Sequence, residues 1–200
     1  NPEVTPVRVA YAGAALFLLA AALPVWSEPI RFEDTTSSAL ADVVPYPRHG
    51  IRFESVADAI GSGLSVADFD GDGLLDIYLA APAAGRGPGA AASGRLLRQQ
   101  KGGACQDTTR TMTAWGPAKA TGTAAADYDG DGWTDLVVTG LGGTRLLHNE
   151  RGRAFRDVTR EAGIVGPAWG TTPVFFDADG DGWLDLFLPS FVEFDAGYRV

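Results

Sequence analysis

The sequence predicts an all-β protein built from three repeats, because one acidic nine-residue pattern occurs three times and each copy precedes a short apolar run. The copies are DFDGDGLLD at 68–76, DYDGDGWTD at 127–135 and DADGDGWLD at 177–185. The chain has 200 residues, 46% of them hydrophobic and 20% charged, which is typical of a domain that buries a core. We therefore expect a folded repeat region.

An apolar segment at the N-terminus comes before the repeats. Residues 9–26 carry no charge, with Arg8 before them and Glu28 after them. As a helix the segment would span about 27 Å, enough for a hydrocarbon core, and its flanking charges favour an N-terminus in the cytoplasm. A secretory signal peptide is the alternative, since the small residues 20–22 offer a cleavage site. In both interpretations residues 1–26 export the rest of the chain.

The remaining chain divides into a linker and first-strand region at 27–50 and a repeat region at 51–200. A shift of fifty residues aligns the second and third acidic copies without a gap and places Cys105 on Phe155, which predicts that Cys105 is a core residue. The first two copies are fifty-nine residues apart. The extra residues fall in a Gly-, Ala- and Pro-rich stretch within 80–94, which indicates a lengthened surface loop.

The apolar runs that follow the acidic copies are predicted β-strands: LLDIYLA, WTDLVVT and WLDLFLP. Their two faces are both apolar, with Leu136 and Val138 on one face and Val137 on the other, so the sheets should be covered on both sides. The best helical candidate after the N-terminal segment is only a turn at 158–162.

A unit of about fifty residues that cannot bury both faces alone is typical of a β-propeller blade, so the predicted fold is a partial β-propeller of about three blades. Three blades do not close a ring, and we expect more chain or a partner. Since the sequence starts with Asn1 instead of Met, we also expect a longer gene product.

The acidic loops have the chemistry of a calcium site. Four neighbouring carboxylates repel one another unless a cation joins them, and oxygen-only ligands in a glycine-containing loop suit Ca²⁺ better than Mg²⁺ or a transition metal. Up to three ions are predicted. The predicted ligands are the carboxylates at positions 1, 3, 5 and 9 of each loop and the carbonyl at position 7: Asp68, Asp70, Asp72, Leu74 and Asp76; Asp127, Asp129, Asp131, Trp133 and Asp135; Asp177, Asp179, Asp181, Trp183 and Asp185.

An EF-hand is excluded as the source of this pattern. Its loop needs a bidentate glutamate at position 12 and a helix on each side. The three copies instead have Leu79, Val138 and Leu188 at position 12, and strands are predicted after them. The acidic loops are therefore expected to join strands.

The pattern D-x-D-G-D-G-x-x-D, with RLLHNERGRAFRDVTREAGI between two copies, resembles the FG-GAP/VCBS repeats of integrin-α-like propellers. The resemblance covers residues 32–200 and is closest to the bacterial relatives of cartilage acidic protein, the ASPIC/UnbV type. It implies a calcium-stabilised β-propeller outside the cytoplasm, with the aspartates as metal ligands and no shared catalytic centre. The chain departs from that type by ending after three repeats and having no ASPIC/UnbV segment.

Composition excludes several classes of function. The net charge of −9 argues against a nucleic-acid partner, which needs clustered Lys and Arg. One cysteine and two histidines exclude a disulfide framework and a multi-cysteine zinc site. No catalytic constellation is recognisable: His49 and His148 are predicted surface residues, and Ser62 lacks the strand-nucleophile-helix context of a hydrolase.

The leading hypothesis is a non-enzymatic calcium-binding module, anchored in the membrane by residues 9–26, exported to the periplasm or the cell exterior, and serving protein binding or assembly. One alternative is an accessory structural subunit of a larger membrane protein complex. Another is an extracellular polysaccharide-active enzyme, for which the sequence offers no acid or base outside the metal loops.

Overall fold

The computed structural model describes residues 34–39, 63–80, 94–109, 116–117 and 119–191. The chain divides into two compact units, Asn1–Glu33 and Asp34–Val200, and every described residue belongs to the second unit. The predicted anchor at 9–26 lies outside the described residues, as does His49. Within the described ranges, no helix has the length and hydrophobicity that a membrane crossing requires.

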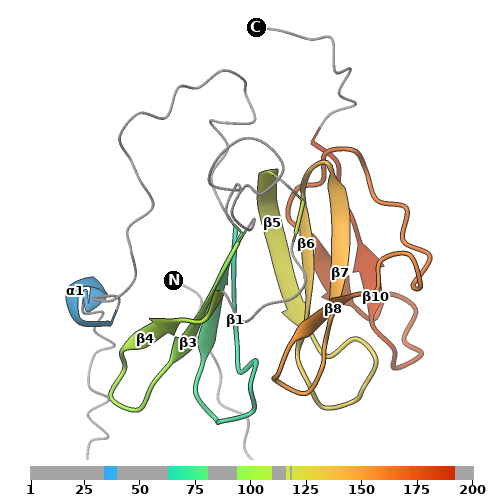
Figure 1. Cartoon of the computed structure of the whole chain (residues 1–200). Coiled ribbons are helices and arrows are strands. Elements are labelled where there is room, and N and C mark those ends of the chain that lie inside the picture. The colour runs from blue at the N-terminus through green and yellow to red at the C-terminus, as the bar shows by residue number, and fades with distance from the viewer. Residues whose placement is uncertain (1–33, 40–62, 81–93, 110–115, 118, 192–200) are drawn as a thin grey trace, which may run out of the picture. The chain divides into compact units, whose positions relative to one another are not determined.

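Ten strands and one short helix make up the described secondary structure (Figure 1). Helix α1 (Thr36–Ala39) lies in the predicted linker and begins after Asp34, whose carboxylate accepts the Thr36 N–H at 3.0 Å. The strands of the first sheet are β1 (Leu64–Ala67), β2 (Asp76–Leu79), β3 (Arg95–Gln99) and β4 (Cys105–Asp107). Those of the second sheet are β5 (Lys119–Ala126), β6 (Asp135–Leu141), β7 (Gly143–Asn149) and β8 (Phe155–Asp157). The third sheet has β9 (Val174–Phe176) and β10 (Asp185–Phe187).

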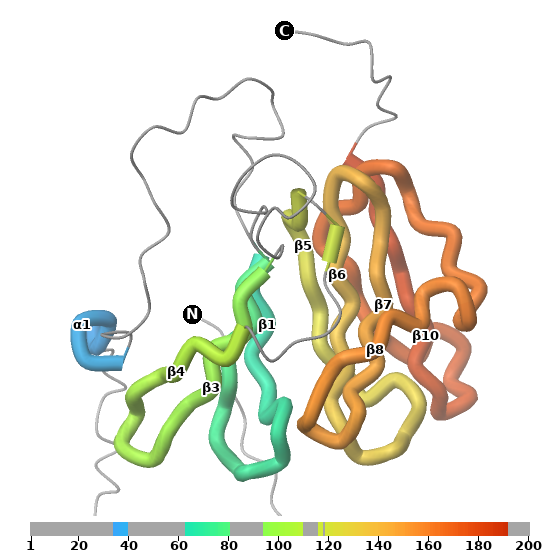
Figure 2. The backbone as a smooth tube through the Cα atoms, viewed as in Figure 1, coloured from blue at the N-terminus to red at the C-terminus, as the bar shows by residue number. Residues whose placement is uncertain are grey.

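The first two sheets are antiparallel meanders in which neighbouring strands follow one another in chain order. Each acidic loop joins the first two strands of its sheet, as the tube in Figure 2 shows. The strands expected after the acidic loops are confirmed as β2, β6 and β10. At 158–162 the chain makes a turn, as expected, in which the Ala162 N–H donates to the Val158 carbonyl at 2.9 Å.

The second sheet is covered on both faces, as the apolar pattern of β6 predicts. Leu136 and Val138 pack in one core cluster with Phe69 and Tyr78 of the first repeat. Val137, on the opposite face, packs in a second cluster that contains Phe175 of the third sheet among its partly buried members. Each face of the second sheet is therefore buried by a neighbouring repeat.

The β3–β4 and β7–β8 hairpins bear out the fifty-residue alignment. Cys105 begins β4 and is 8% exposed, and Phe155 begins β8 and is 2% exposed. The Phe155 ring packs edge-on against Phe69, with 5.9 Å between the ring centroids. Cys105 is thus a core residue, and burial raises the pKa of its thiol.

Candidate metal centre

The three acidic loops have one backbone conformation. Glycines at positions 4 and 6 have positive φ in every loop, for example 73° at Gly130 and 89° at Gly132. L-residues with a Cβ rarely adopt such angles, so these glycines allow the tight wrap of the loop. In the second loop, the backbone folds around the position-1 aspartate, Asp127.

The position-1 aspartates organise the loops. Asp127 accepts the N–H of Asp131 at 3.0 Å and that of Gly132 at 2.9 Å. The glycine at position 6 donates in the same way to Asp68 at 2.8 Å and to Asp177 at 2.9 Å. Hydrogen bonds of this kind hold the carboxylate in place.

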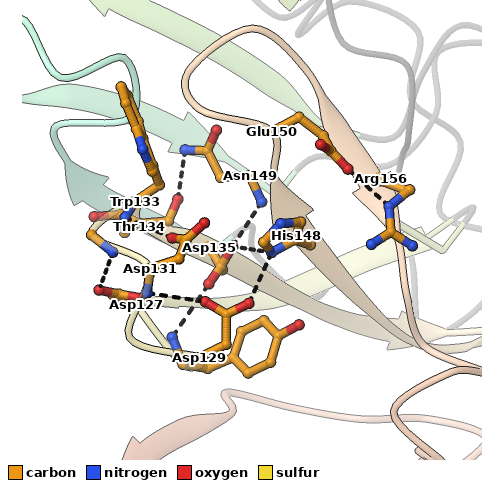
Figure 3. Close-up of polar contacts among 12 residues, drawn as sticks. Asp127, Asp129, Asp131, Trp133, Thr134, Asp135, His148, Asn149, Glu150 and Arg156 are labelled. Carbon is orange, nitrogen blue, oxygen red and sulfur yellow. Dashed lines mark hydrogen bonds and ion pairs between the residues drawn. The ribbon is translucent and has the colours of Figure 1, made fainter.

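The position-9 aspartates tie the first two loops to the neighbouring strands, and Figure 3 shows the second loop. Asp135 is fully buried; one of its oxygens accepts the Tyr128 N–H at 3.3 Å and the other accepts the Asn149 N–H at 2.7 Å. Asp76 accepts from Phe69 and Gln99 in the same way. Burial raises the pKa of Asp135 to about 6, and it also raises the pKa of Asp76.

In the third loop the position-9 residue, Asp185, is exposed and accepts the Ala178 N–H at 2.8 Å. Its sheet has only two strands among the described residues, so no counterpart of Gln99 or Asn149 is described for it. The third loop shares internal hydrogen bonds with the other two, but its position-9 aspartate is not buried.

Positions 3 and 5 complete the acidic set. In each loop the position-3 carboxylate accepts the N–H of position 5 at 3.2–3.3 Å, and the position-5 carboxylate accepts the N–H of position 7 at 2.8–2.9 Å. Position 5 thus fixes the backbone at Leu74, Trp133 and Trp183. The carbonyls of these three residues stay predicted ligands.

The structure brings together the carboxylates of positions 1, 3 and 9 in every loop, with one oxygen of each within 4.8 Å of the others. The groups are Asp68, Asp70 and Asp76; Asp127, Asp129 and Asp135; and Asp177, Asp179 and Asp185. Asp131 falls in a separate group with Asp129 and His148, whereas Asp72 and Asp181 fall in none of the groups found among the described residues. Three of the four predicted carboxylates therefore converge in each loop.

Two basic residues beside the loops were not predicted. His148 was expected at the surface, but its side chain is only 16% exposed, and its Nδ1 lies 3.3 Å from both Asp129 and Asp135 (Figure 3). Arg98 occupies the same repeat position beside the first loop, 3.2 Å from Asp70. The fifty-residue alignment pairs Arg98 with His148. Because both side chains are basic, this pairing was the sequence signal that could have predicted a basic residue beside each of the first two loops.

These loops have the chemistry to bind a divalent cation. Each convergent group offers carboxylate oxygens only, which hard cations such as Ca²⁺ prefer over softer metals. The hydrogen bonds from the loop backbone orient these oxygens before an ion arrives. The donor set and the loop geometry therefore fit the predicted calcium.

The fold and the loops define a β-repeat protein whose hairpins carry acidic, cation-competent loops. The model of the FG-GAP-like repeat matches the chain twice, over residues 68–138 and 127–188, which together span more than half of it. Each match begins at a position-1 aspartate and runs into or past the strand after the next acidic loop. The chain belongs to the FG-GAP-like repeat family. A search of the curated proteins finds none that matches it.

Proposed function

We propose that the protein is a non-enzymatic, calcium-binding module of the β-propeller type that serves protein binding or assembly. The observation that carries this proposal is the threefold recurrence of one loop, with the same glycine conformation, the same hydrogen bonds from the N–H groups of positions 5, 6 and 7 and the same convergent carboxylates. A polar turn in a hairpin does not need four aspartates at fixed spacing. A shared requirement for a cation explains why all three loops have them.

Calcium would stabilise the repeats. Without an ion, Asp135 and Asp76 are buried acids whose charged forms are disfavoured, and the neighbouring aspartates repel them. Bound calcium removes this cost, so the binding free energy becomes folding free energy. Sites of this kind outside the cytoplasm bind calcium at about 10⁻⁴ to 10⁻³ M.

The binding test is calcium stoichiometry, measured by equilibrium dialysis on the full chain. We expect up to three ions per chain, and one fewer for each of the variants Asp68→Asn, Asp127→Asn and Asp177→Asn. The matched control is Asp157→Asn, since Asp157 is an aspartate outside the acidic loops. Retention of all ions by every loop variant, or the absence of bound calcium in the parent protein, contradicts the proposal.

The third sheet supports a role in binding or assembly. β9 and β10 pack Phe175 and Leu186 toward the second sheet, whereas Val174, Phe176 and Phe187 are 45–57% exposed. Trp183 in the adjoining loop is 63% exposed. Clustered apolar residues at a surface commonly mark a contact with another protein, so we propose a protein partner here.

We further propose that the module works outside the cytoplasm and is held at the membrane by residues 9–26. Calcium sites of millimolar affinity suit that compartment, and the uncharged N-terminal segment supports an anchor. Fractionation of cells that produce the full chain tests this: we expect the protein in the membrane fraction, with its repeats open to added protease. Recovery in the cytosolic fraction contradicts it, and co-migration with a defined complex would favour the accessory-subunit alternative.

A further inference from the structure

Asn149, the last residue of β7, contacts two acidic loops at once. Its side chain is fully buried, and its Nδ2 donates to the Phe69 carbonyl of the first loop and to the Thr134 carbonyl of the second, each at 2.9 Å. Its Oδ1 accepts the Gly152 N–H at 2.8 Å, so the whole amide group is hydrogen-bonded. Its backbone N–H donates to Asp135 at 2.7 Å. One residue thus fixes parts of both candidate calcium sites.

Arg98 makes a second link between the same two repeats. Its Nη1 lies 3.2 Å from Asp70 of the first loop, and its Nη2 donates to the Gly152 carbonyl at 2.6 Å. Gly152 itself packs against the first loop, because a Cβ at this position would lie 2.8 Å from the Asp70 Cα. The β7–β8 turn is therefore linked through Arg98 to Asp70 of the first loop and through Asn149 to Asp135 of the second.

These contacts form one continuous path from the first loop to the second: Asp70, Arg98, Gly152, Asn149 and Asp135. Asn149, within this path, is fully buried with its whole side-chain amide hydrogen-bonded, and the loss of such a residue leaves its buried partners unsatisfied. No hydrogen bond among the described residues joins the third loop to either of the others. The third loop thus lies outside this hydrogen-bonded path.

We propose that calcium binding at the first and second loops is positively coupled through the β7–β8 turn, with Asn149 and Arg98 as positioning residues. An ion in the second loop fixes Asp135 and hence Asn149, which holds the backbone of the first loop at Phe69. The second ion then binds a protein in which part of the ordering has already occurred. Coupling of binding free energies is reciprocal, so either loop strengthens the other. Since it requires that both loops bind calcium, this coupling rests on the proposed function.

Calorimetric titration of calcium into loop variants of the full chain tests the coupling. In Asp177→Asn both coupled loops are intact, and Asp68→Asn/Asp177→Asn leaves only the second. We expect the second loop to bind calcium at least about fivefold more tightly when the first is intact, the lower end of typical coupling. Equal affinity in the two proteins overturns the coupling but leaves calcium binding in place. Failure of Asp177→Asn to bind any calcium removes the proposed function as well.

Two further variants assign the coupling to the turn. Each of these variants is made in both Asp177→Asn and Asp68→Asn/Asp177→Asn. Asn149→Ala and Arg98→Gln should each reduce the difference in the second loop's affinity between the two backgrounds, and Glu150→Gln, an exposed neighbour in the same turn, should keep it. Arg98→Gln decides the question if circular dichroism shows that Asn149→Ala is unfolded, since Arg98 is partly exposed. An undiminished difference in folded Arg98→Gln overturns the assignment.

Discussion

Asp135 combines two roles that make opposite demands on its charge. As a predicted ligand it must be ionised, yet its complete burial raises its pKa to about 6. The N–H groups of Tyr128 and Asn149 offset part of the cost of burying the charge. The residue is therefore held in place for a cation, and in the metal-free protein its ionisation opposes folding.

This conflict predicts how pH acts on the metal-free protein. The folded pKa of about 6 lies above the ordinary value of 3.8, so the folded state holds the proton more tightly than the unfolded chain. The contribution of Asp135 to stability is thus fully present below about pH 4 and is lost as pH rises through 6, by at most about 3 kcal/mol. Denaturant unfolding in EDTA at several pH values measures it.

The variant Asp135→Asn is the control, since it cannot titrate and should show a shallower fall in stability between about pH 4 and 6. A slope equal to that of the parent protein would show that burial of Asp135 does not govern the effect. In saturating calcium the dependence should reverse, because a proton and the ion compete for the same carboxylate.

At the scale of elements, the hairpins were largely predictable. The apolar runs are predicted to have two buried faces, and the fifty-residue shift places Cys105 on Phe155; both features are confirmed. The glycines at positions 4 and 6 have the positive φ that a tight loop needs. Each of these features rests on local sequence or on internal repetition. Patterns of these kinds can be read without knowledge of how distant segments meet.

The contacts between elements were not predictable in the same way. Asn149 reaches Phe69, eighty residues away, and His148 lies beside Asp129 because β7 pairs with β6 in one particular register. The register between these strands cannot be read from a single sequence, so His148 was predicted to be a surface residue. Asp72 and Asp181 fit the ligand spacing, and their side chains accept hydrogen bonds from the backbone of their own loops. They join none of the described carboxylate groups, so their role as ligands stays a prediction.

At the scale of the whole molecule, the described repeats depend on one another. The second sheet buries one face against the first repeat and the other against the third. Repeat proteins of this kind gain stability from the interfaces between neighbours. Neutralisation of the acidic loops by a cation should therefore stabilise the whole repeat region, and not only the hairpin that holds each loop.

Thermal unfolding of the full chain with and without calcium tests this most directly. At about 10 mM calcium each loop should contribute about 1.4–2.7 kcal/mol if its Kd lies between about 10⁻³ and 10⁻⁴ M. Three loops together should then raise Tm by roughly 10–30 °C relative to EDTA, and magnesium at the same concentration should raise it less. An unchanged Tm, with no calcium in the protein by elemental analysis, would contradict the claim that these loops are calcium sites.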